Sequence, residues 1–464
     1  MKRIAIVGGG IAGLTAAYEL SRLANNGAAV EAVLFEASPR LGGIVETVRE
    51  GGFVIECGPD AWVTEKPWAR ELAEDLGLAD QIMHSNDATR KTYVLIDGQL
   101  KAMPDGMRMM VPSNLDALDQ SDLFSAEAKQ AFHAEVNRAE ELKASTPQYD
   151  ESVAAFVQRH FGDEVLRTIG APLLRGVFGG DVAKLSVRAV MAPFVAMERE
   201  HGSLITATQA RAAASGNKQS PVFTTLQTGL GTLVDGMIAA IPKDWIRLGT
   251  KIRSISRSHK RWQIQTSTSQ ETFDAVMMAA PAHIARELLL PIDGRAAKLM
   301  EMDASSAVVV AFGFPDAKFR SPPGFGFLVP QASGSRLLAC TFVDQKFDHR
   351  VPQNGKLIRA FFGGGAAERL MHCGNDEVAS IARLELAHIL GPLPEPQITV
   401  VRRWPKSLPQ YSVGHLELMQ ELDEHIRSLE GLYLLGNGYR GVGLPDLIRD
   451  ARAAAQQSIE GDKR

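Results

Sequence analysis

Cysteine is scarce in this chain, and the few cysteines lack the spacing of a cross-link or a metal site. Only Cys57, Cys340 and Cys373 occur among the 464 residues, and no two of them form a Cys-x-x-Cys pair. Their odd number and wide separation argue against a disulfide framework and a structural zinc site, and they fit a reducing cytoplasm. The 11 histidines include no His-x-x-x-His pair, so we expect no bound metal.

Long apolar runs and a strong excess of one charge are also missing. The sequence contains no run of about 18 apolar residues, so no transmembrane helix is predicted. Glycines interrupt the apolar residues near the start, which argues against a signal peptide. The net charge of −4 gives no reason to expect a nucleic-acid partner. Residues 103–112 contain four methionines, which could line an apolar channel, contact a membrane surface or pack in a core. We expect a cytoplasmic protein, and leave peripheral contact with the cytoplasmic membrane and a homodimer open.

Glycines are concentrated near the start of the chain. Residues 8–13 read Gly-Gly-Gly-Ile-Ala-Gly and lie between a strand predicted over residues 3–7 and a helix with apolar periodicity. Gly8 allows a tight turn, Gly10 lets the backbone approach a pyrophosphate, and Gly13 allows helix and strand to pack closely. The pyrophosphate would lie at the positive end of the helix dipole. The pattern predicts dinucleotide binding; the alternative is a glycine-rich turn in an α/β protein that binds no nucleotide.

A carboxylate and a second pair of glycines extend this motif. The strand predicted over residues 30–35 ends at Glu36, whose carboxylate can accept hydrogen bonds from ribose hydroxyls and would repel a 2′-phosphate. Residues 40–43 read Arg-Leu-Gly-Gly, so bare backbone and the charge of Arg40 would lie beside the phosphates, unless the segment is a plain loop turn. This doublet resembles that of FAD enzymes in the amine-oxidase and protoporphyrinogen-oxidase superfamily.

Later segments make the resemblance specific to the protoporphyrinogen/coproporphyrinogen oxidases. The motifs of that family are similar to residues 56–60, 176–181, 185–186, 403–405, 408–411, 414–415 and 435–448. The similarity runs from residue 2 to about residue 455. It departs from the family at Asp450 and Ala451, where the family often has a small residue and glycine.

The resemblance implies FAD-dependent oxidation of protoporphyrinogen IX or coproporphyrinogen III to the porphyrin, in haem biosynthesis. Six hydrogens leave in three two-electron steps, dioxygen reoxidises the flavin, and the flavin carries the redox chemistry. No catalytic side chain is therefore predicted, and His415 is expected to make structural hydrogen bonds. The last of these motifs, residues 435–448, is the closing motif. It contains no cysteine, so we expect the FAD to be non-covalent. The predicted FAD-binding residues are Gly8, Gly10, Ile11, Ala12, Gly13, Glu36, Ala37, Arg40, Gly42, Gly43, Ile44, Gly58, Pro59, Asp60, Ala61, Ile252, Trp404, Gly436, Asn437, Val442, Gly443 and Leu444.

Some of these residues are carried over from the family by position. Ile252 matches a family position whose backbone contacts adenine, and it falls in a strand predicted over residues 246–255. Trp404 matches a tryptophan near the flavin, with an ordinary core aromatic as the alternative. The glycine turn before Pro445 is expected to open a helix whose N-terminus stabilises negative charge on the reduced flavin.

The propionates of either porphyrinogen require cations. Arg108 matches an arginine that the family places toward a substrate carboxylate, although a solvated surface arginine is the alternative. Lys66 and Arg175 are further candidates. Phe361 and Phe362 end a predicted strand, so one of them faces the cavity, where it could stack on a pyrrole or simply pack in a core. The methionines and phenylalanines favour the more apolar protoporphyrinogen, whereas the three cations leave coproporphyrinogen open.

The chain as a whole is expected to be α/β. We predict a discontinuous Rossmann-like FAD-binding domain (1–65, 222–290 and 397–460), an α+β substrate-binding domain with an antiparallel sheet (84–112 and 291–396), and a helical lobe (113–213). A helix is expected over residues 66–83, and a hairpin joins residues 93–96 to 99–102. The alternatives left open are a flavin amine oxidase or desaturase of the same fold, and a nucleotide-binding scaffold without activity.

Overall fold

A parallel five-stranded sheet carries the glycine-rich turn. The computed structural model describes residues 1–214, 221–316, 319 and 321–460. The strand order in this sheet is β12-β2-β1-β16-β22. The strands are β1 (Lys2–Val7), β2 (Val30–Phe35), β12 (Ile246–Arg247), β16 (Ala275–Met278) and β22 (Leu432–Leu434). Because both faces of the sheet are covered, β16 and the part of β1 after Arg3 are entirely apolar.

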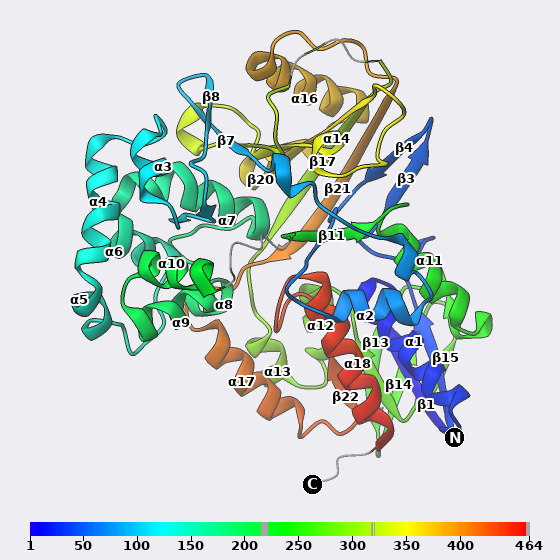
Figure 1. Cartoon of the computed structure of the whole chain (residues 1–464). Coiled ribbons are helices and arrows are strands. Elements are labelled where there is room, and N and C mark those ends of the chain that lie inside the picture. Colours follow the sequence, from blue (N-terminus) through cyan, green and yellow to red (C-terminus); the bar gives the residue numbers. More distant parts are fainter. Residues whose placement is uncertain (215–220, 317–318, 320, 461–464) are drawn as a thin grey trace.

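Helices cover one face of this sheet, and a small sheet with further helices covers the other (Figure 1). The first layer contains α1 (Ile11–Asn25), α11 (Gly231–Ala240) and α18 (Leu444–Glu460). The second contains β13 (Ser254–Ser258), β14 (Arg261–Gln265), β15 (Gln270–Phe273), α12 (Ala282–Leu289), α13 (Gly294–Leu299) and α17 (His415–Ile426). The start, middle and end of the chain therefore build one layered unit.

A seven-stranded sheet forms the upper part of the molecule in Figure 1. Its order is β21-β17-β20-β19-β18-β7-β8, and its neighbours are antiparallel except for the parallel pair β18 and β7. The strands are β7 (Thr92–Ile96), β8 (Gln99–Ala102), β17 (Ala304–Phe314), β18 (Gly326–Leu328), β19 (Ala339–Phe342), β20 (Lys356–Gly363) and β21 (Ile398–Pro409). Helix α16 (Asn375–Leu390) packs on it, with α14 (Val343–Lys346) and α15 (Gly364–Leu370) at its strand ends.

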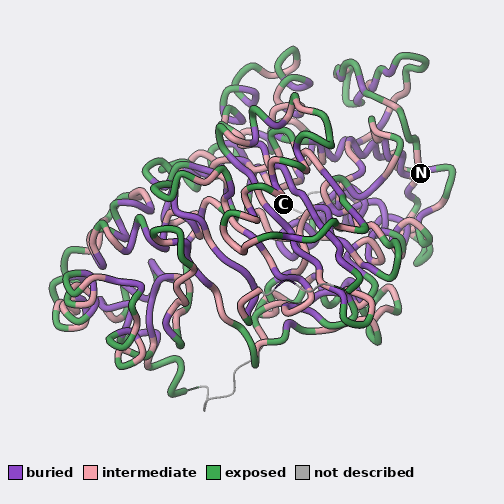
Figure 2. The backbone as a smooth tube through the Cα atoms, turned by 90° about the horizontal axis from the view of Figure 1, so that it is seen from above, coloured by how far each residue is buried: buried purple, intermediate pink, exposed green. Residues whose placement is uncertain are grey.

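A helical lobe lies at the left of Figure 1. Its helices are α3 (Leu115–Gln120), α4 (Ala126–Asn137), α5 (Ala139–Ala144), α6 (Val153–Val165), α7 (Ala171–Phe178), α8 (Val187–Val190), α9 (Ala192–His201) and α10 (Leu204–Ala214). Buried segments run through the middle of the lobe, as they do through the sheets, with exposed turns outside (Figure 2). The remaining short elements are β3 (Thr47–Glu50), β4 (Phe53–Glu56), β5 (Trp62–Val63), α2 (Trp68–Asp75), β6 (Ile82–His84), β9 (Met107–Arg108), β10 (Val111–Pro112) and β11 (Phe223–Leu226).

The core of the lobe contains a buried histidine between two glutamates. His160 Nδ1 lies 3.0 Å from Glu135 and its Nε2 lies 3.3 Å from Glu198. Burial alone would lower the pKa of His160, but the two carboxylates outweigh it and raise that pKa. The cluster holds α4, α6 and α9 together through charge rather than through apolar packing alone.

The expected α/β fold is confirmed, with corrections to single elements. The helix expected over residues 66–83 ends at Asp75, because the chain turns at Gly77 with φ +74, and residues 82–84 form a strand. The strand expected over residues 246–255 is split at Gly249, where φ is +61. The hairpin is confirmed, with positive φ at both turn residues.

Two pairings between distant strands also differ from expectation. The large sheet is not purely antiparallel, because β7 pairs with β18 in parallel. Strand β21 pairs with β17 in this sheet, so the first part of the segment 397–460 lies outside the nucleotide-binding sheet in which it was expected. The boundaries of the three expected domains otherwise stay predictions.

Candidate functional site

The glycine loop between β1 and α1 has the geometry of a phosphate cradle. Gly8 has φ +107, and a Cβ there would lie 2.7 Å from the carbonyl oxygen of Ala279. A Cβ on Gly13 would lie 1.9 Å from the carbonyl oxygen of Gly8, so helix and strand need glycine to pack this closely. A Cβ on Gly10 would meet only the Cα of Gly43, at 4.0 Å. The space above Gly10 is open, next to helix amides that have no intrahelical partner.

Glu36 lies at the tip of β2, beside this loop. Its carboxylate accepts hydrogen bonds from the backbone amides of Gly9 and Ser38, each at 2.7 Å. These two bonds fix the orientation of the carboxylate at the edge of the cradle. The position is the one at which a ribose is recognised in dinucleotide-binding folds.

The second glycine pair packs directly against the first. The amide of Gly42 donates to the carbonyl oxygen of Gly9 at 2.8 Å, and a Cβ on Gly43 would lie 3.1 Å from the Cα of Gly10. Arg40 also makes contacts within this loop. Its guanidinium donates to the carbonyl oxygens of Leu41 (3.1 Å) and Gly43 (2.5 Å), and lies 3.3 Å from Glu46. Arg40 therefore stabilises the loop, and its contact with the phosphates stays a prediction.

The turn at residues 58–60 is held from several sides. A Cβ on Gly58 would lie 2.0 Å from the carbonyl oxygen of Ile44, and Trp404 Nε1 donates to the carbonyl oxygen of Cys57 at 2.7 Å. Asp60 pairs with Lys346 at 2.9 Å and with Arg359 at 3.3 Å. Burial alone would raise the pKa of Asp60, but the two cations outweigh it and lower that pKa. Asp60 is thus bound by protein cations and positions the turn.

Arg350 and Glu56 extend this buried charge cluster. Arg350 donates to Thr225 Oγ1 and to the carbonyl oxygen of Leu226, both at 2.9 Å, and lies 3.6 Å from Glu56. Burial raises the pKa of Glu56. Sequence reasoning missed Lys346, Arg350 and Arg359. The only signal was a charged residue, Arg359, within the apolar run that follows Lys356 in strand β20.

The closing turn, residues 437–441, is held in place by hydrogen bonds from residues that carry the family resemblance. Tyr411 donates its hydroxyl to the carbonyl oxygen of Asn437 at 2.6 Å, and accepts from the amide of Gly441 at 3.0 Å. His415 stacks on Tyr411, with ring centroids 3.8 Å apart, and its Nε2 lies 2.9 Å from the carbonyl oxygen of Tyr439. Burial lowers the pKa of His415, which fits its expected structural role.

The other predicted FAD-binding residues lie around these turns. Ile252 is buried against the sheet but lies in an irregular segment before β13, not in the expected strand. Gly436 has φ +122, and Val442 packs on the core of the helical lobe. The remaining residues are the buried Ile11, Ala12 and Leu444, the half-buried Pro59, Ala61 and Gly443, and the exposed Ala37. Helix α18 begins at Leu444, directly after the turn, as expected.

The four predicted substrate residues have different surroundings. Lys66 is bound by Asp446 in the first turn of α18, at 2.6 and 2.8 Å. Arg108 is exposed and pairs with the exposed Glu65 at 2.6 Å. Phe361 is half-buried, with the Arg359 guanidinium 4.9 Å from its ring centroid, whereas Phe362 is buried in the core of the large sheet. Arg175 lines a cavity, and among the described residues its side chain has no hydrogen-bond or ion-pair partner.

The methionine-rich segment packs in the protein. Met110 is buried in the core of the helical lobe, and Met103, Met107 and Met109 pack against that core while partly exposed. Within the described part of the chain, no helix is long and apolar enough to cross a membrane. Over the same residues, no group of three or more histidine, cysteine, aspartate or glutamate side chains is placed to hold a metal.

The open cradle, the oriented carboxylate and the glycine-glycine contact fit a bound dinucleotide. Comparison with known proteins agrees. The model of the family described as flavin containing amine oxidoreductase matches residues 11–459. Coproporphyrinogen III oxidase of Bacillus subtilis is 33% identical over 467 residues, covering 99% of this chain and 98% of that protein. Protoporphyrinogen oxidase 2 of Arabidopsis thaliana is 27% identical and covers 99% and 94%.

Solved structures show the same likeness. A crystal structure from Exiguobacterium sp. 255-15, provisionally named a protoporphyrinogen oxidase, superposes with a TM-score of 0.86 at 30% identity and covers 99% of both chains. Cyclohexylamine oxidase of Brevibacterium oxydans superposes with a TM-score of 0.72 at 16% identity over the full length of both chains, which shows the shared fold alone.

Proposed function

Because the chain belongs to the flavin-containing amine oxidoreductase family, we propose that it oxidises a porphyrinogen to the porphyrin in haem biosynthesis. Its cofactor is FAD, and we propose that the FAD is non-covalent, with dioxygen as the final electron acceptor. The observation that carries the proposal is the full-length similarity, at 33% identity, to a coproporphyrinogen III oxidase. The hydrogen bonds of Tyr411 and His415 to the closing turn also support it, because these two residues carry the resemblance to porphyrinogen oxidases.

We propose coproporphyrinogen III as the preferred substrate. The methionine-rich segment was the main argument for an apolar substrate, and it packs on the core of the helical lobe. That argument for protoporphyrinogen IX is therefore weakened. Several of the curated relatives are named coproporphyrinogen III oxidases, which supports the substrate with four propionates.

The chemistry divides between cofactor and chain. Bound FAD supplies a two-electron acceptor, which is needed three times to remove six hydrogens from the macrocycle. The glycine loop and Glu36 bind the cofactor, while the turn at residues 58–60 is held rigid by Lys346 and Arg359. We assign no side chain as a general base. Phe361 is proposed to contact the macrocycle, because it lies on the same side of β20 as Arg359.

We propose a cytoplasmic location, which the three free cysteines support. Membrane contact and a homodimer remain predictions. Co-sedimentation with lipid vesicles and light scattering of the purified protein would test them. Dioxygen as acceptor is tested by measuring hydrogen peroxide formed per porphyrin.

Steady-state turnover tests the proposed function. The purified protein in air should convert coproporphyrinogen III to fluorescent coproporphyrin III with release of peroxide. Cyclohexylamine and putrescine, tested as substrates under the same conditions, should give no peroxide above background. Amine oxidation without porphyrinogen oxidation would favour the amine oxidase alternative. Bound FAD with no turnover of either class would favour a nucleotide-binding scaffold.

A further inference from the structure

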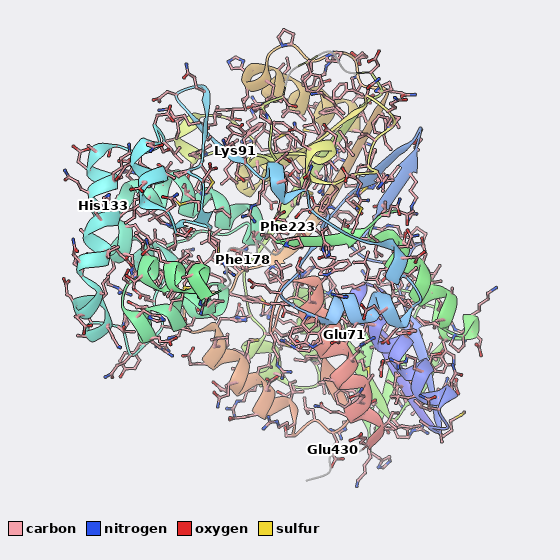
Figure 3. All side chains as sticks on the ribbon, viewed as in Figure 1. Glu71, Lys91, His133, Phe178, Phe223 and Glu430 are labelled. Atoms are coloured by element: carbon pink, nitrogen blue, oxygen red, sulfur yellow. The ribbon has the colours of Figure 1, made fainter. Side chains whose placement is uncertain are left out.

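A cavity of about 490 Å³ opens where the helical lobe meets the large sheet. Its walls are the end of α7, the turn from β20 into α15, and the connection from β18 to β19. Phe178, the last residue of α7, lies near the centre of the molecule in Figure 3, between the lobe and the sheets. The cavity has the size of a typical small-molecule site.

Arginine side chains from three separate elements line this cavity. Arg175 comes from α7, Arg336 from the connection before β19, and Arg369 from α15. Within the described residues, Arg175 and Arg369 have no side-chain hydrogen bond or ion pair, and Arg336 lies 3.7 Å from Glu385. Asp181 is the carboxylate among the lining residues, and it accepts a hydrogen bond from the amide of Ala183 in its own turn. The cavity therefore has an excess of unpaired positive charge.

Glycines keep the cavity open beside these arginines. Gly363, Gly364 and Gly365 line it in sequence, and a Cβ on Gly364 would meet no atom within 4 Å. A Cβ on Gly365 would have Arg369 Nη1 as its nearest neighbour, at 3.7 Å, so this guanidinium lies over the glycine backbone. Side chains at positions 364 and 365 would fill space that a ligand could otherwise occupy, whereas a Cβ on Gly363 would lie 2.4 Å from Leu338.

The cavity is connected by β20 to the turn beside the cofactor. Side chains in a strand alternate between its two faces, so Arg359, Phe361 and Gly363 lie on the same face of β20. The cavity, which Gly363 lines, is therefore two strand residues away from Phe361. Arg359 donates to the carbonyl oxygen of Gly58, in the turn at residues 58–60. A ligand that contacts Phe361 can therefore extend a substituent into the cavity.

The opposite wall is connected to the closing turn. Gln410 Nε2 donates to the carbonyl oxygen of Phe178 at 2.6 Å. A Cβ on Gly180 would lie 1.5 Å from Gln410 Oε1, so a side chain there would displace Gln410. The next residue, Tyr411, bonds to Asn437 and Gly441. Both walls are thus fixed relative to the residues that surround the cofactor.

We propose that Arg175, Arg336 and Arg369 form a carboxylate-binding subsite that selects a porphyrinogen with four propionates over one with two. The inference rests on the proposed function. Guanidinium groups bind carboxylates through paired, charge-assisted hydrogen bonds. A vinyl group in the same place offers no acceptor and leaves the arginines unpaired. The subsite therefore contributes to binding of coproporphyrinogen III and not of protoporphyrinogen IX.

The test compares the double variant Arg175→Gln/Arg369→Gln with wild type and with Arg295→Gln. Arg295 is an exposed arginine of α13 that does not line the cavity. Binding of the two products, coproporphyrin III and protoporphyrin IX, is measured by fluorescence titration, and both porphyrinogens are assayed by steady-state kinetics. The unchanged flavin absorption spectrum reports an intact fold.

For the double variant, we expect Kd for coproporphyrin III and KM for coproporphyrinogen III to rise about tenfold, the combined effect of two partly exposed ion pairs. The kcat and the Kd for protoporphyrin IX should change less than twofold, and Arg295→Gln should match wild type. Raising the salt concentration should weaken wild-type binding of coproporphyrin III more than that of the double variant. The lysine double variant, Arg175→Lys/Arg369→Lys, should recover part of the affinity because it keeps the charge.

The outcomes separate the two proposals. Wild-type protein that oxidises neither porphyrinogen contradicts the proposed function. The subsite proposal alone is overturned if wild-type protein oxidises coproporphyrinogen III while the double variant binds both products as tightly as wild type does. An equal rise in Kd for both products also overturns it, because the arginines would then not distinguish four propionates from two. If the double variant fails to bind FAD, the single variant Arg336→Gln, at an exposed position, is measured in the same way. Its Kd for coproporphyrin III should be two- to threefold higher than that of wild type. An unchanged Kd would overturn the subsite.

Discussion

Replacing Gly10 by alanine should separate cofactor binding from folding. Gly10 has φ −72 and ψ −176, a conformation open to any residue, and a Cβ there would meet only the Cα of Gly43, at 4.0 Å. The apoprotein should therefore fold, and become more stable by about 0.4–1 kcal/mol because the unfolded chain loses freedom. The added methyl group would occupy the space above the cradle. Loss of one hydrogen bond to a charged phosphate costs about 1.5–3 kcal/mol, which raises Kd for FAD roughly 10- to 150-fold.

The assay is titration of flavin-free protein with FAD, together with thermal unfolding of the apoprotein. Gly13→Ala is the matched control, since its Cβ would lie 1.9 Å from the carbonyl oxygen of Gly8. That variant should lose both stability and FAD binding. Gly10→Ala protein that binds FAD within twofold of wild type would refute the assignment of the cradle.

Three further predictions concern single side chains. Glu36→Ala should weaken FAD binding by about 1–3 kcal/mol through lost ribose hydrogen bonds, measured by the same titration; unchanged affinity would show that the carboxylate serves another purpose. Lys346→Met should lower the free energy of unfolding of the apoprotein in urea by about 1–3 kcal/mol, because the half-buried Asp60 loses a partner, whereas the exposed Lys298→Met should not. The raised pKa of His160 means that its contribution to stability is complete below its unfolded pKa of about 6.5 and is lost as the pH rises through the folded pKa. The urea midpoint of wild type, measured from pH 6 to 9, should therefore fall more than that of His160→Gln, and parallel curves would contradict the ion-pair account.

Local motifs could be predicted from the sequence because their function depends on neighbouring residues. The roles of Gly8, Gly10 and Gly13 follow from one turn, and the structure shows the expected close contacts at Gly8 and Gly13 and the expected open space at Gly10. The hairpin turn at Asp97 and Gly98 was predictable for the same reason. Gly77 also carried a readable signal, since glycine commonly ends a helix, and it explains why α2 is short.

Long-range partners could not be predicted in this way. Lys66 has the charge expected of a propionate ligand, but Asp446, 380 residues away, binds it. Asp60, whose contact with the cofactor stays a prediction, pairs with Lys346, which is 286 residues away. The parallel pairing of β7 with β18 likewise joins two distant segments. No local pattern encodes such pairs, and only the assembled fold shows which charges are already neutralised.

Anaerobic mixing of the holoprotein with coproporphyrinogen III tests the central claim most directly. The account predicts that the visible absorption of bound flavin bleaches in a single phase whose rate rises with porphyrinogen concentration. Admission of air should then restore the flavin spectrum and release fluorescent porphyrin. Flavin that stays oxidised under coproporphyrinogen III and protoporphyrinogen IX alike, while an amine bleaches it, would contradict the account.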